Sequence, residues 1–185
     1  MQAPDVFHAR PRQLSRAEYD RMAQLGFFQG ERLELIHGIV VRMTPIGPQH
    51  SEIVDRLTTL CVGAVGGAAR VRIQQPFLAT DESEPEPDVA IVPARSYATA
   101  HPAEALLIIE VAETSLAYDR STKAPLYAAS NVAEYWVIDI GARSVEVFTA
   151  PVSGEYTHVR RAGVAEEITP QALPGLLVSV RELFD

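Results

Sequence analysis

Residues 105–111 read Ala-Leu-Leu-Ile-Ile-Glu-Val, an apolar run with one acid, Glu110, near its end. The five residues from Ala105 to Ile109 leave no polar face, which is typical of a strand in the centre of a sheet with helices on both sides. The run therefore predicts the central strand of an α/β domain.

The segments before this strand alternate between helical and strand patterns. Ser15 and Glu18 form a capping box that predicts a helix from 15 to about 25, closed by Gly26. A hairpin is predicted for 31–36 and 39–43 across His37 and Gly38. Apolar residues at helical spacing predict a helix over 49–65, and shorter runs predict strands over 70–78 and 88–92.

The segments after the central strand complete the expected architecture. We predict a helix over 122–130 with Pro125 near its start, a strand over 134–139, an antiparallel appendix of strands over 144–149 and 156–161, and a last strand over 176–180. The fold class is then α/β (α+β), with a mixed β-sheet core flanked by helices and hairpins added at both ends. The length favours a single domain, 1–185, with its core at about 49–140.

Composition excludes several classes of function. The net charge of −8 argues against broad attraction to nucleic acid or to anionic membrane, so any contact with DNA should be local, metal-assisted or made by a dimer. A single cysteine, Cys61, excludes an intramolecular disulfide and a zinc-thiolate site. The N-terminus has no apolar signal region and no apolar run is long enough for a membrane span, so we expect a soluble, cytoplasmic protein.

Two acids stand at the ends of neighbouring predicted strands. Asp88 follows Pro87 and opens one strand, and Glu110 nearly closes the next. If these strands are antiparallel neighbours, the two carboxylates meet at one edge of the sheet and repel each other. Oxygen ligands of this kind favour a hard cation, Mg²⁺, for which Mn²⁺ can substitute.

Lys123 is the only lysine among 16 lysine and arginine residues. An arginine-rich composition could leave one lysine without a role. Alternatively, a compact ammonium that fits a tight site is required at this position. Together with Asp88 and Glu110, such a lysine completes the set needed for metal-assisted phosphodiester hydrolysis.

Several pieces of the chain resemble a known family. In chain order these pieces are RLELIHG at 32–38, EPDVAIV at 86–92, IEVA at 109–112, YDRSTK at 118–123, and Tyr127 followed by NVAEYWVID at 131–139. Their order and spacing are similar to those of the Uma family, a bacterial group of restriction-endonuclease-like proteins with a PD-(D/E)xK nuclease fold. The resemblance covers about 15–148.

The resemblance implies roles for individual residues. Asp88 and Glu110 would be metal ligands, with the Val111 carbonyl as a third. In the wider fold a lysine usually stands two residues after the acid, and here that position is Ala112. Either the site is inactive or the lysine function has moved to Lys123, which Asp119, four residues earlier, could pair with.

Three further residues are weaker candidates. Glu34 lies in the first hairpin where the family places an acid, so it could supply a further carboxylate to the cation, although a Glu between two leucines is also the polar face of an alternating strand. His50 could contact a phosphate or activate water, but a histidine at a helix start is often a local cap. Gln74 could face the same cleft, and Tyr127 is interpreted as a core or interface aromatic.

The leading interpretation is a Mg²⁺-dependent endonuclease that hydrolyses DNA as a homodimer. We expect the hairpin over 31–43 and the antiparallel C-terminal strands to form its two-fold interface. One alternative is a nuclease-fold protein that has lost catalysis and serves as a binding or regulatory module, favoured by Ala112 and the acidic composition. A second is a hydrolase of smaller phosphate esters, which would need less basic surface.

Overall fold

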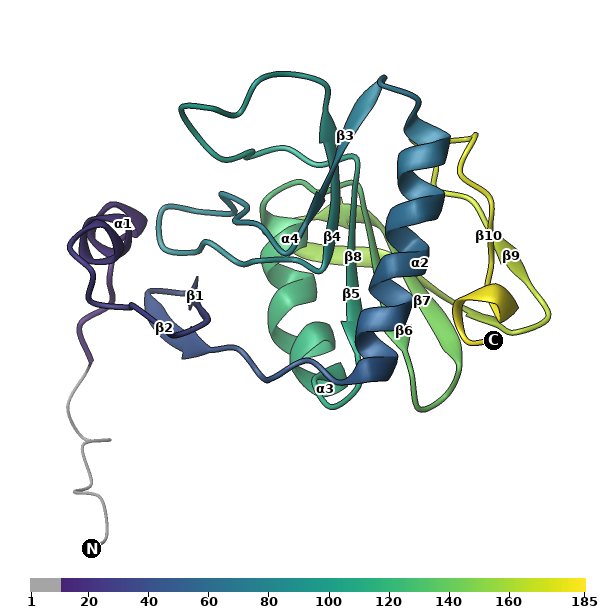
Figure 1. The fold of residues 1–185 in the computed structure, drawn as a ribbon, viewed down its shortest axis with the longest axis horizontal. Coiled ribbons are helices and arrows are strands. Elements are labelled where there is room, and N and C mark those ends of the chain that lie inside the picture. Colours follow the sequence, from purple (N-terminus) through teal and green to yellow (C-terminus); the bar gives the residue numbers. More distant parts are fainter. Residues whose placement is uncertain (1–10) are drawn as a thin grey trace, which may run out of the picture.

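A mixed sheet of six strands forms the centre of the computed structural model, which describes residues 11–185 (Figure 1). The strands lie in the order β3-β4-β5-β6-β7-β8. Their bounds are β3 Ala69–Ile73, β4 Val89–Pro93, β5 Leu107–Ala112, β6 Glu134–Asp139, β7 Ser144–Val152 and β8 Glu155–Gly163. Within this sheet β5 and β6 are parallel, and every other neighbouring pair is antiparallel. The mixed α/β architecture predicted from the sequence is confirmed.

Helices cover both faces of the central strand β5. Every residue of β5 is buried, as its continuous apolar run predicts. The long helix α2 (Pro48–Val65) packs its apolar stripe on one face, where Leu57 shares a core cluster with Ile109 and Trp136. The helix α4 (Ala124–Ala129) packs on the other, where Tyr127 shares a second cluster with Ile108. Glu110 therefore stands in a strand with no solvent-exposed face.

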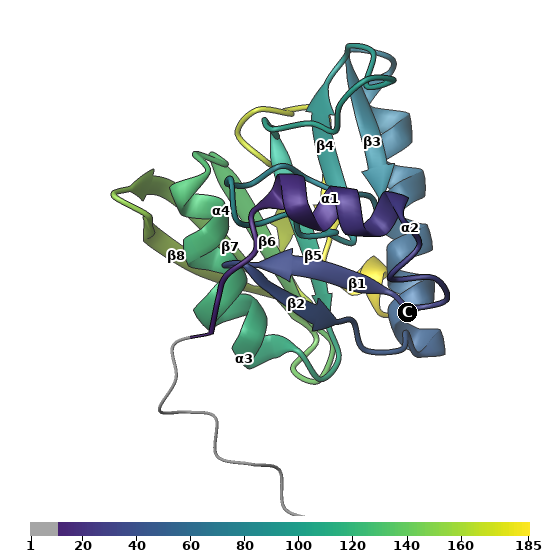
Figure 2. The ribbon, with the colours of Figure 1, turned by 90° about the vertical axis from the view of Figure 1, so that its left-hand side faces the viewer.

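The N-terminal helix and hairpin lie next to each other in front of the sheet (Figure 2). The helix α1 (Arg16–Gln24) has the predicted capping box between Ser15 and Glu18. The strands β1 (Leu33–Ile36) and β2 (Ile39–Arg42) form their own two-stranded sheet. The turn between them has φ of 49° at His37 and 74° at Gly38, as the hairpin prediction requires.

The helical crossover from β5 to β6 begins earlier than predicted. The expected start at Thr122 is wrong, because helix α3 (Leu116–Tyr118) leads directly into a π-helical turn, η1 (Asp119–Lys123), and then into α4. Pro125 suggests a helix start because it lacks a backbone N–H, and it does lie in the first turn of α4. The wider π turn before it lets the helix continue through this point.

Two strand predictions also need correction. Strand β3 ends at Ile73, not at Leu78, because Gln74 has a left-handed φ of 49° and leaves the strand direction. Strands β7 and β8 are not a separate appendix, since β7 pairs with β6 and continues the main sheet. The small sheet of β9 (Glu167–Ile168) and β10 (Val178–Ser179) and the short helix η2 (Arg181–Leu183) close the chain.

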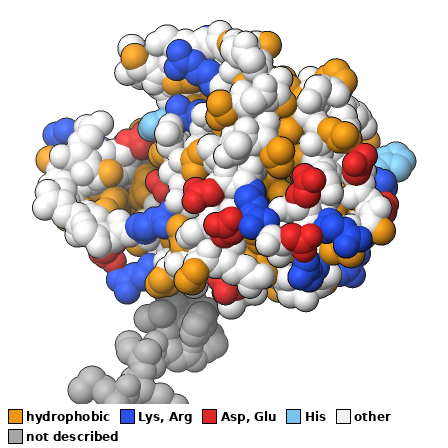
Figure 3. Space-filling model, turned by 45° about the vertical axis from the view of Figure 1, so that its right-hand side comes forward, with side chains coloured by type: hydrophobic (Ala, Val, Ile, Leu, Met, Phe, Trp, Pro, Cys, Tyr) orange, Lys and Arg blue, Asp and Glu red, His pale blue; other side chains and the backbone are white. Residues whose placement is uncertain are grey.

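The surface carries charges of both signs. On the face shown in Figure 3, acidic and basic side chains lie next to one another. This face therefore does not present a continuous basic surface. Among residues 11–185, no helix is both long and apolar enough to cross a membrane.

Candidate active site

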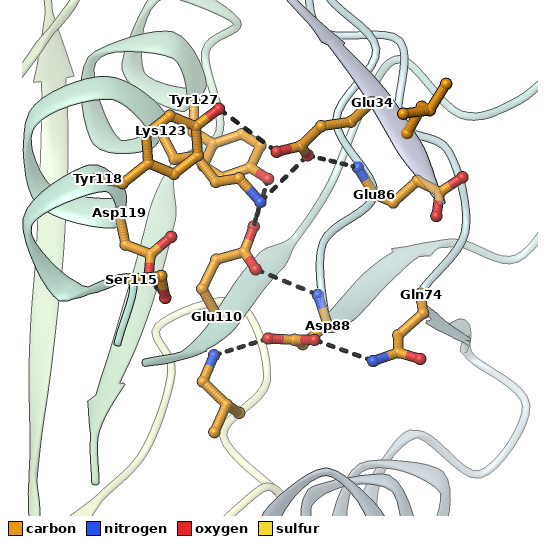
Figure 4. Close-up of polar contacts among 12 residues, drawn as sticks. Glu34, Gln74, Glu86, Asp88, Glu110, Ser115, Tyr118, Asp119, Lys123 and Tyr127 are labelled. Carbon is orange, nitrogen blue, oxygen red and sulfur yellow. Dashed lines mark hydrogen bonds and ion pairs between the residues drawn. The ribbon is translucent and has the colours of Figure 1, made fainter. Parts of the chain in front are cut away.

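Antiparallel pairing of β4 with β5 brings Asp88 next to Glu110. Val89 pairs with Ile109 in this register, so the residues just outside that pair, Asp88 and Glu110, are also adjacent. The backbone N–H of Asp88 donates to Glu110 Oε2 at 3.4 Å, and the Val111 N–H donates to Asp88 Oδ2 at 2.9 Å (Figure 4). Both side chains are buried. The meeting of the two acids at neighbouring strands is as the sequence predicts.

Asp88 is held as a carboxylate by His50 and Gln74. Its Oδ1 lies 3.0 Å from His50 Nε2 and accepts a hydrogen bond from Gln74 Nε2 at 3.1 Å. Burial alone would raise the pKa of Asp88, but the hydrogen bond and charge of His50 outweigh it, so this pKa lies below its usual value. Burial likewise opposes charge on His50, yet the bond to Asp88 raises the His50 pKa above its usual value. The pair therefore favours an imidazolium beside a carboxylate.

Glu110 accepts hydrogen bonds from two donors on the crossover between β5 and β6. Lys123 Nζ lies 2.9 Å from Glu110 Oε1, and the Tyr127 hydroxyl donates to the same oxygen at 2.7 Å. Burial raises the pKa of Glu110 to about 8, against the opposing charge of Lys123. The charge of Lys123, 2.9 Å away, favours the ionised form of Glu110.

Glu34 reaches the same lysine from the N-terminal hairpin. Its Oε2 lies 3.3 Å from Lys123 Nζ, and its Oε1 accepts the Tyr118 hydroxyl at 3.4 Å. Burial would lower the pKa of Lys123, but the charges of Glu110 and Glu34 raise it well above its usual value. Lys123 therefore stays protonated, and Figure 4 shows its side-chain nitrogen between the carboxylates of Glu34 and Glu110.

The π-helical turn aims Lys123 at the site. The Ala124 N–H donates to the Asp119 carbonyl five residues earlier, and the Tyr135 hydroxyl donates to the same carbonyl at 3.3 Å. The Asp119 carboxylate accepts the Ser115 hydroxyl at 2.6 Å. The expected direct pairing of Asp119 with Lys123 is not present between these two residues, because Ser115 takes the carboxylate and Lys123 is turned toward Glu110.

One cavity of about 340 Å³ collects these side chains. The candidate residues from the sequence that line it are Glu34, His50, Gln74, Asp88, Glu110, Val111, Asp119 and Lys123. Ala112 does not line it and belongs to the core cluster of Ala124 and Tyr127. The helix that carries Lys123 thus fills the space beside Ala112, the position at which the family resemblance implies a lysine.

Among the groups that sequence reasoning did not place in the site are three hydroxyls that bind its carboxylates. Tyr127 is buried as predicted, but its hydroxyl also binds Glu110. Tyr118 binds Glu34, and Ser115 binds Asp119. The spacing of Tyr127, four residues after Lys123, is a signal that could have placed both on one helix face.

The cavity holds an excess of acids over bases. Its acids are Glu34, Glu86, Asp88, Glu110, Glu113 and Asp119, and its bases are Arg32, Arg42, His50 and Lys123. If all are ionised, this leaves two uncompensated negative charges, the number that a divalent cation would neutralise. Burial is the first cause of the raised pKa values of Glu110 and Asp119, and the charges of Asp88 and Glu34 add to it.

Two carboxylate oxygens keep unused capacity to bind a cation. Within residues 11–185, no group of three or more His, Cys, Asp or Glu side chains is already arranged around a metal-sized point. In the part of the chain that the structure describes, Asp88 Oδ2 accepts only the Val111 N–H, and Glu110 Oε2 accepts only the long contact from the Asp88 N–H. A carboxylate offers about four acceptor sites in total, so both oxygens can take a further partner. This oxygen-only donor set fits a hard divalent cation.

The fold and the cavity define an α/β protein of the nuclease-like class. A family model described as "Putative restriction endonuclease", Uma2, matches residues 16–181, and the chain belongs to this family. Among proteins of known structure, it resembles a "putative nuclease belonging to DUF820" from Anabaena variabilis, with a TM-score of 0.72, 15% identity, and coverage of 92% of this chain and 97% of that chain. No curated protein matches the chain.

Proposed function

We propose that this protein is a Mg²⁺-dependent endonuclease that hydrolyses phosphodiester bonds of DNA. The observation that supports this most directly is the convergence of Asp88, Glu110 and Lys123 on one cavity, with Lys123 Nζ 2.9 Å from Glu110. Membership of a family described as "Putative restriction endonuclease" favours nuclease activity.

Asp88 and Glu110 would hold the cation, with the Val111 carbonyl as a third ligand. When bound, Mg²⁺ supplies Lewis acidity toward a phosphoryl oxygen and offsets the two excess negative charges of the cavity. His50 and Gln74 keep Asp88 ionised and fix its orientation through contacts at 3.0 and 3.1 Å. Mn²⁺ has similar oxygen preferences and would substitute.

Lys123 would supply positive charge to the phosphate as its bond breaks. Hydrolysis forms a bond from a water oxygen to phosphorus and breaks one ester bond, so negative charge grows on the phosphoryl oxygens and on the leaving oxygen. Lys123 is fixed by Glu34 and Glu110, so it needs no reorganisation to meet that charge. Glu34 thus acts as a positioning residue for Lys123.

A homodimer would place two such sites on the two strands of a duplex. The hairpin β1–β2 lines the candidate site, so it is less free to form an interface than strand β8, which ends the main sheet and leaves Val159 57% exposed. Light scattering that gives twice the chain mass would support this arrangement. A monomer mass at all concentrations would contradict it.

A cleavage assay tests the proposed activity. Plasmid, single-stranded DNA, RNA and bis(p-nitrophenyl) phosphate would be incubated with wild type, Asp88→Asn and the matched surface control Asp55→Asn, in Mg²⁺, in Mn²⁺ and in EDTA. Asp55 is exposed on α2, so its substitution should change nothing. We expect metal-dependent DNA cleavage by wild type and Asp55→Asn only. Turnover of the small diester without DNA cleavage would favour a smaller phosphate ester as substrate, and no turnover by folded, metal-bound protein would favour the binding module.

A further inference from the structure

A second cavity, of about 600 Å³, lies beside the candidate active site, and Glu86 lines both. Its walls come from helix α1, from residues 76–78 and from the loop 97–101. None of the other residues that line it belongs to the candidate active site. Apart from Glu86, its lining residues are therefore distinct from those of the candidate active site.

Glu84 is a buried carboxylate at this cavity. Its backbone pairs with Leu35 of the hairpin, with the Glu84 N–H donating to the Leu35 carbonyl at 2.7 Å. The residue is only 5% exposed, and its Oε2 has no hydrogen-bond partner among residues 11–185. Burial, and then the charge of Asp20, raise the pKa of Glu84 to about 7. Buried carboxylates are nearly always paired, so Glu84 lacks a partner that its environment requires.

The neighbouring groups of the cavity are already engaged elsewhere. The Tyr19 hydroxyl donates to the Leu33 carbonyl at 3.0 Å, and the Tyr97 hydroxyl donates to the Pro93 carbonyl at 3.0 Å. The Arg16 guanidinium donates to the Thr80 carbonyl at 3.3 Å. These groups cannot turn to Glu84 without losing those bonds.

The acids that line the cavity outnumber its permanently charged base, Arg16, whose charge partly opposes the raised pKa of Glu84. Asp20 lines it from α1, and no residue between 11 and 185 forms a hydrogen bond or ion pair with the Asp20 side chain. Glu86 adds a third acid on the side of the active site. Partners that supply N–H donors and positive charge together would satisfy these acids, as ammonium and guanidinium groups do.

We propose that this cavity is a binding site for an organic cation, whose ammonium or guanidinium group pairs with Glu84 at the buried end and with Asp20 at α1. The cation is either a small molecule or an arginine or lysine side chain of a partner protein, since both present the same group. The site needs neither metal nor nucleic acid, so it stands independently of the proposed nuclease function.

Calorimetric titration at pH 8 with n-butylguanidinium tests the proposal, and n-butylurea serves as a neutral probe of the same shape. Wild type should bind the cation and bind the urea at least tenfold more weakly. Glu84→Gln should weaken cation binding tenfold or more, since a charge-assisted hydrogen bond is lost, and Asp20→Asn by about threefold. Glu155→Gln, an exposed acid on β8, is the matched control and should bind as wild type does.

A capped Gly-Arg-Gly peptide distinguishes the two sources of the cation. Binding of the peptide as tightly as n-butylguanidinium indicates a protein side chain, and binding of the free cation alone indicates a small molecule. Either result supports the site. No binding of either probe by wild type, equal binding of n-butylurea, or unchanged binding by Glu84→Gln would overturn it. If circular dichroism shows that Glu84→Gln does not fold, unchanged affinity of Asp20→Asn overturns it instead.

Discussion

The Arg120 guanidinium holds the Glu146 carboxylate through two of its nitrogens, with Nε donating to Oε2 at 2.7 Å. Arg120 lies in the π-helical turn, and Glu146 lies on β7. Lys123 ends the same turn and points into the candidate active site. The pair therefore ties the turn that carries Lys123 to the main sheet, and we expect it to position the lysine.

Arg120→Met should loosen this tie and leave Glu146 buried without its partner. Arg120 is 40% exposed, so we expect a loss of about 1–2 kcal/mol in the free energy of unfolding, which lowers Tm by roughly 3–6 °C. The double variant Arg120→Met/Glu146→Met should recover most of this stability. Cleavage should stay low in both variants if the pair positions Lys123, whereas recovery of cleavage together with stability would show a purely structural role. Arg70→Met, on an exposed position of β3, is the control.

Divalent cations should stabilise the wild type. A cation that Asp88 and Glu110 bind only in the folded state raises both the free energy of unfolding and Tm once its concentration exceeds its Kd. At a hundredfold excess over Kd the free energy of unfolding rises by about 3 kcal/mol. Asp88→Asn should abolish most of the shift, and Asp55→Asn should keep it. Differential scanning calorimetry with Mg²⁺ and Mn²⁺ measures this, and identical shifts in all three proteins would place the cation elsewhere.

Lys123→Met should affect both stability and chemistry. Removal of the ammonium leaves Glu34 and Glu110 buried without their cation, at a cost of about 3 kcal/mol at pH 8 and less at pH 5, where a proton can replace it. Cleavage should fall by about 10² or more.

The double variant Lys123→Met/Glu34→Gln separates these two effects. It removes one of the uncompensated acids, so we expect chemical denaturation to show partial recovery of stability while cleavage remains absent. Lys123→Arg should restore little, because the guanidinium is larger than the ammonium that fits between the two acids. Full activity in the double variant would remove Lys123 from the chemistry.

Glu84→Gln should make stability less dependent on pH. The pKa of Glu84 rises from 4.5 to about 7 on folding, so the folded state keeps a proton that the unfolded state releases between these values. The wild type therefore loses stability as pH rises from about 4.5 to 7, by up to about 3 kcal/mol through this group. Urea denaturation at pH 5 and pH 8 should show that Glu84→Gln raises the free energy of unfolding relative to the wild type at pH 8 only. A gain of equal size at both pH values would contradict the buried-charge explanation.

Local patterns predicted most of the elements, because each signal lies within a few residues. The capping box at Ser15, the His37-Gly38 turn and the apolar run before Glu110 all have the predicted structure. The adjacency of Asp88 and Glu110 was also predictable, since it needs only antiparallel pairing of consecutive strands.

Features that depend on distant contacts were not predictable. The π turn is held by a hydroxyl from Tyr135 on β6, which no local pattern around Asp119 reveals. Sequence proximity suggested that Asp119 pairs with Lys123, but the lysine instead meets Glu34, which is brought in by the N-terminal hairpin. The unpaired state of Glu84 likewise depends on how α1 packs over its loop.

Because β5 and β6 are parallel, the strand acids Asp88 and Glu110 and the lysine of the candidate site, Lys123, lie on different kinds of segment in the chain. A parallel pair needs a crossover, and here that crossover is the segment that carries Lys123, whereas the two strand acids lie on an antiparallel pair. Loss of one residue, such as Ser121, from the π turn would restore ordinary helix geometry and rotate helix α3 by about 100° relative to helix α4. Deletions in the crossover before Lys123 can therefore change, during evolution, which side chains of α3 face the site while Lys123 and the strand acids stay in place.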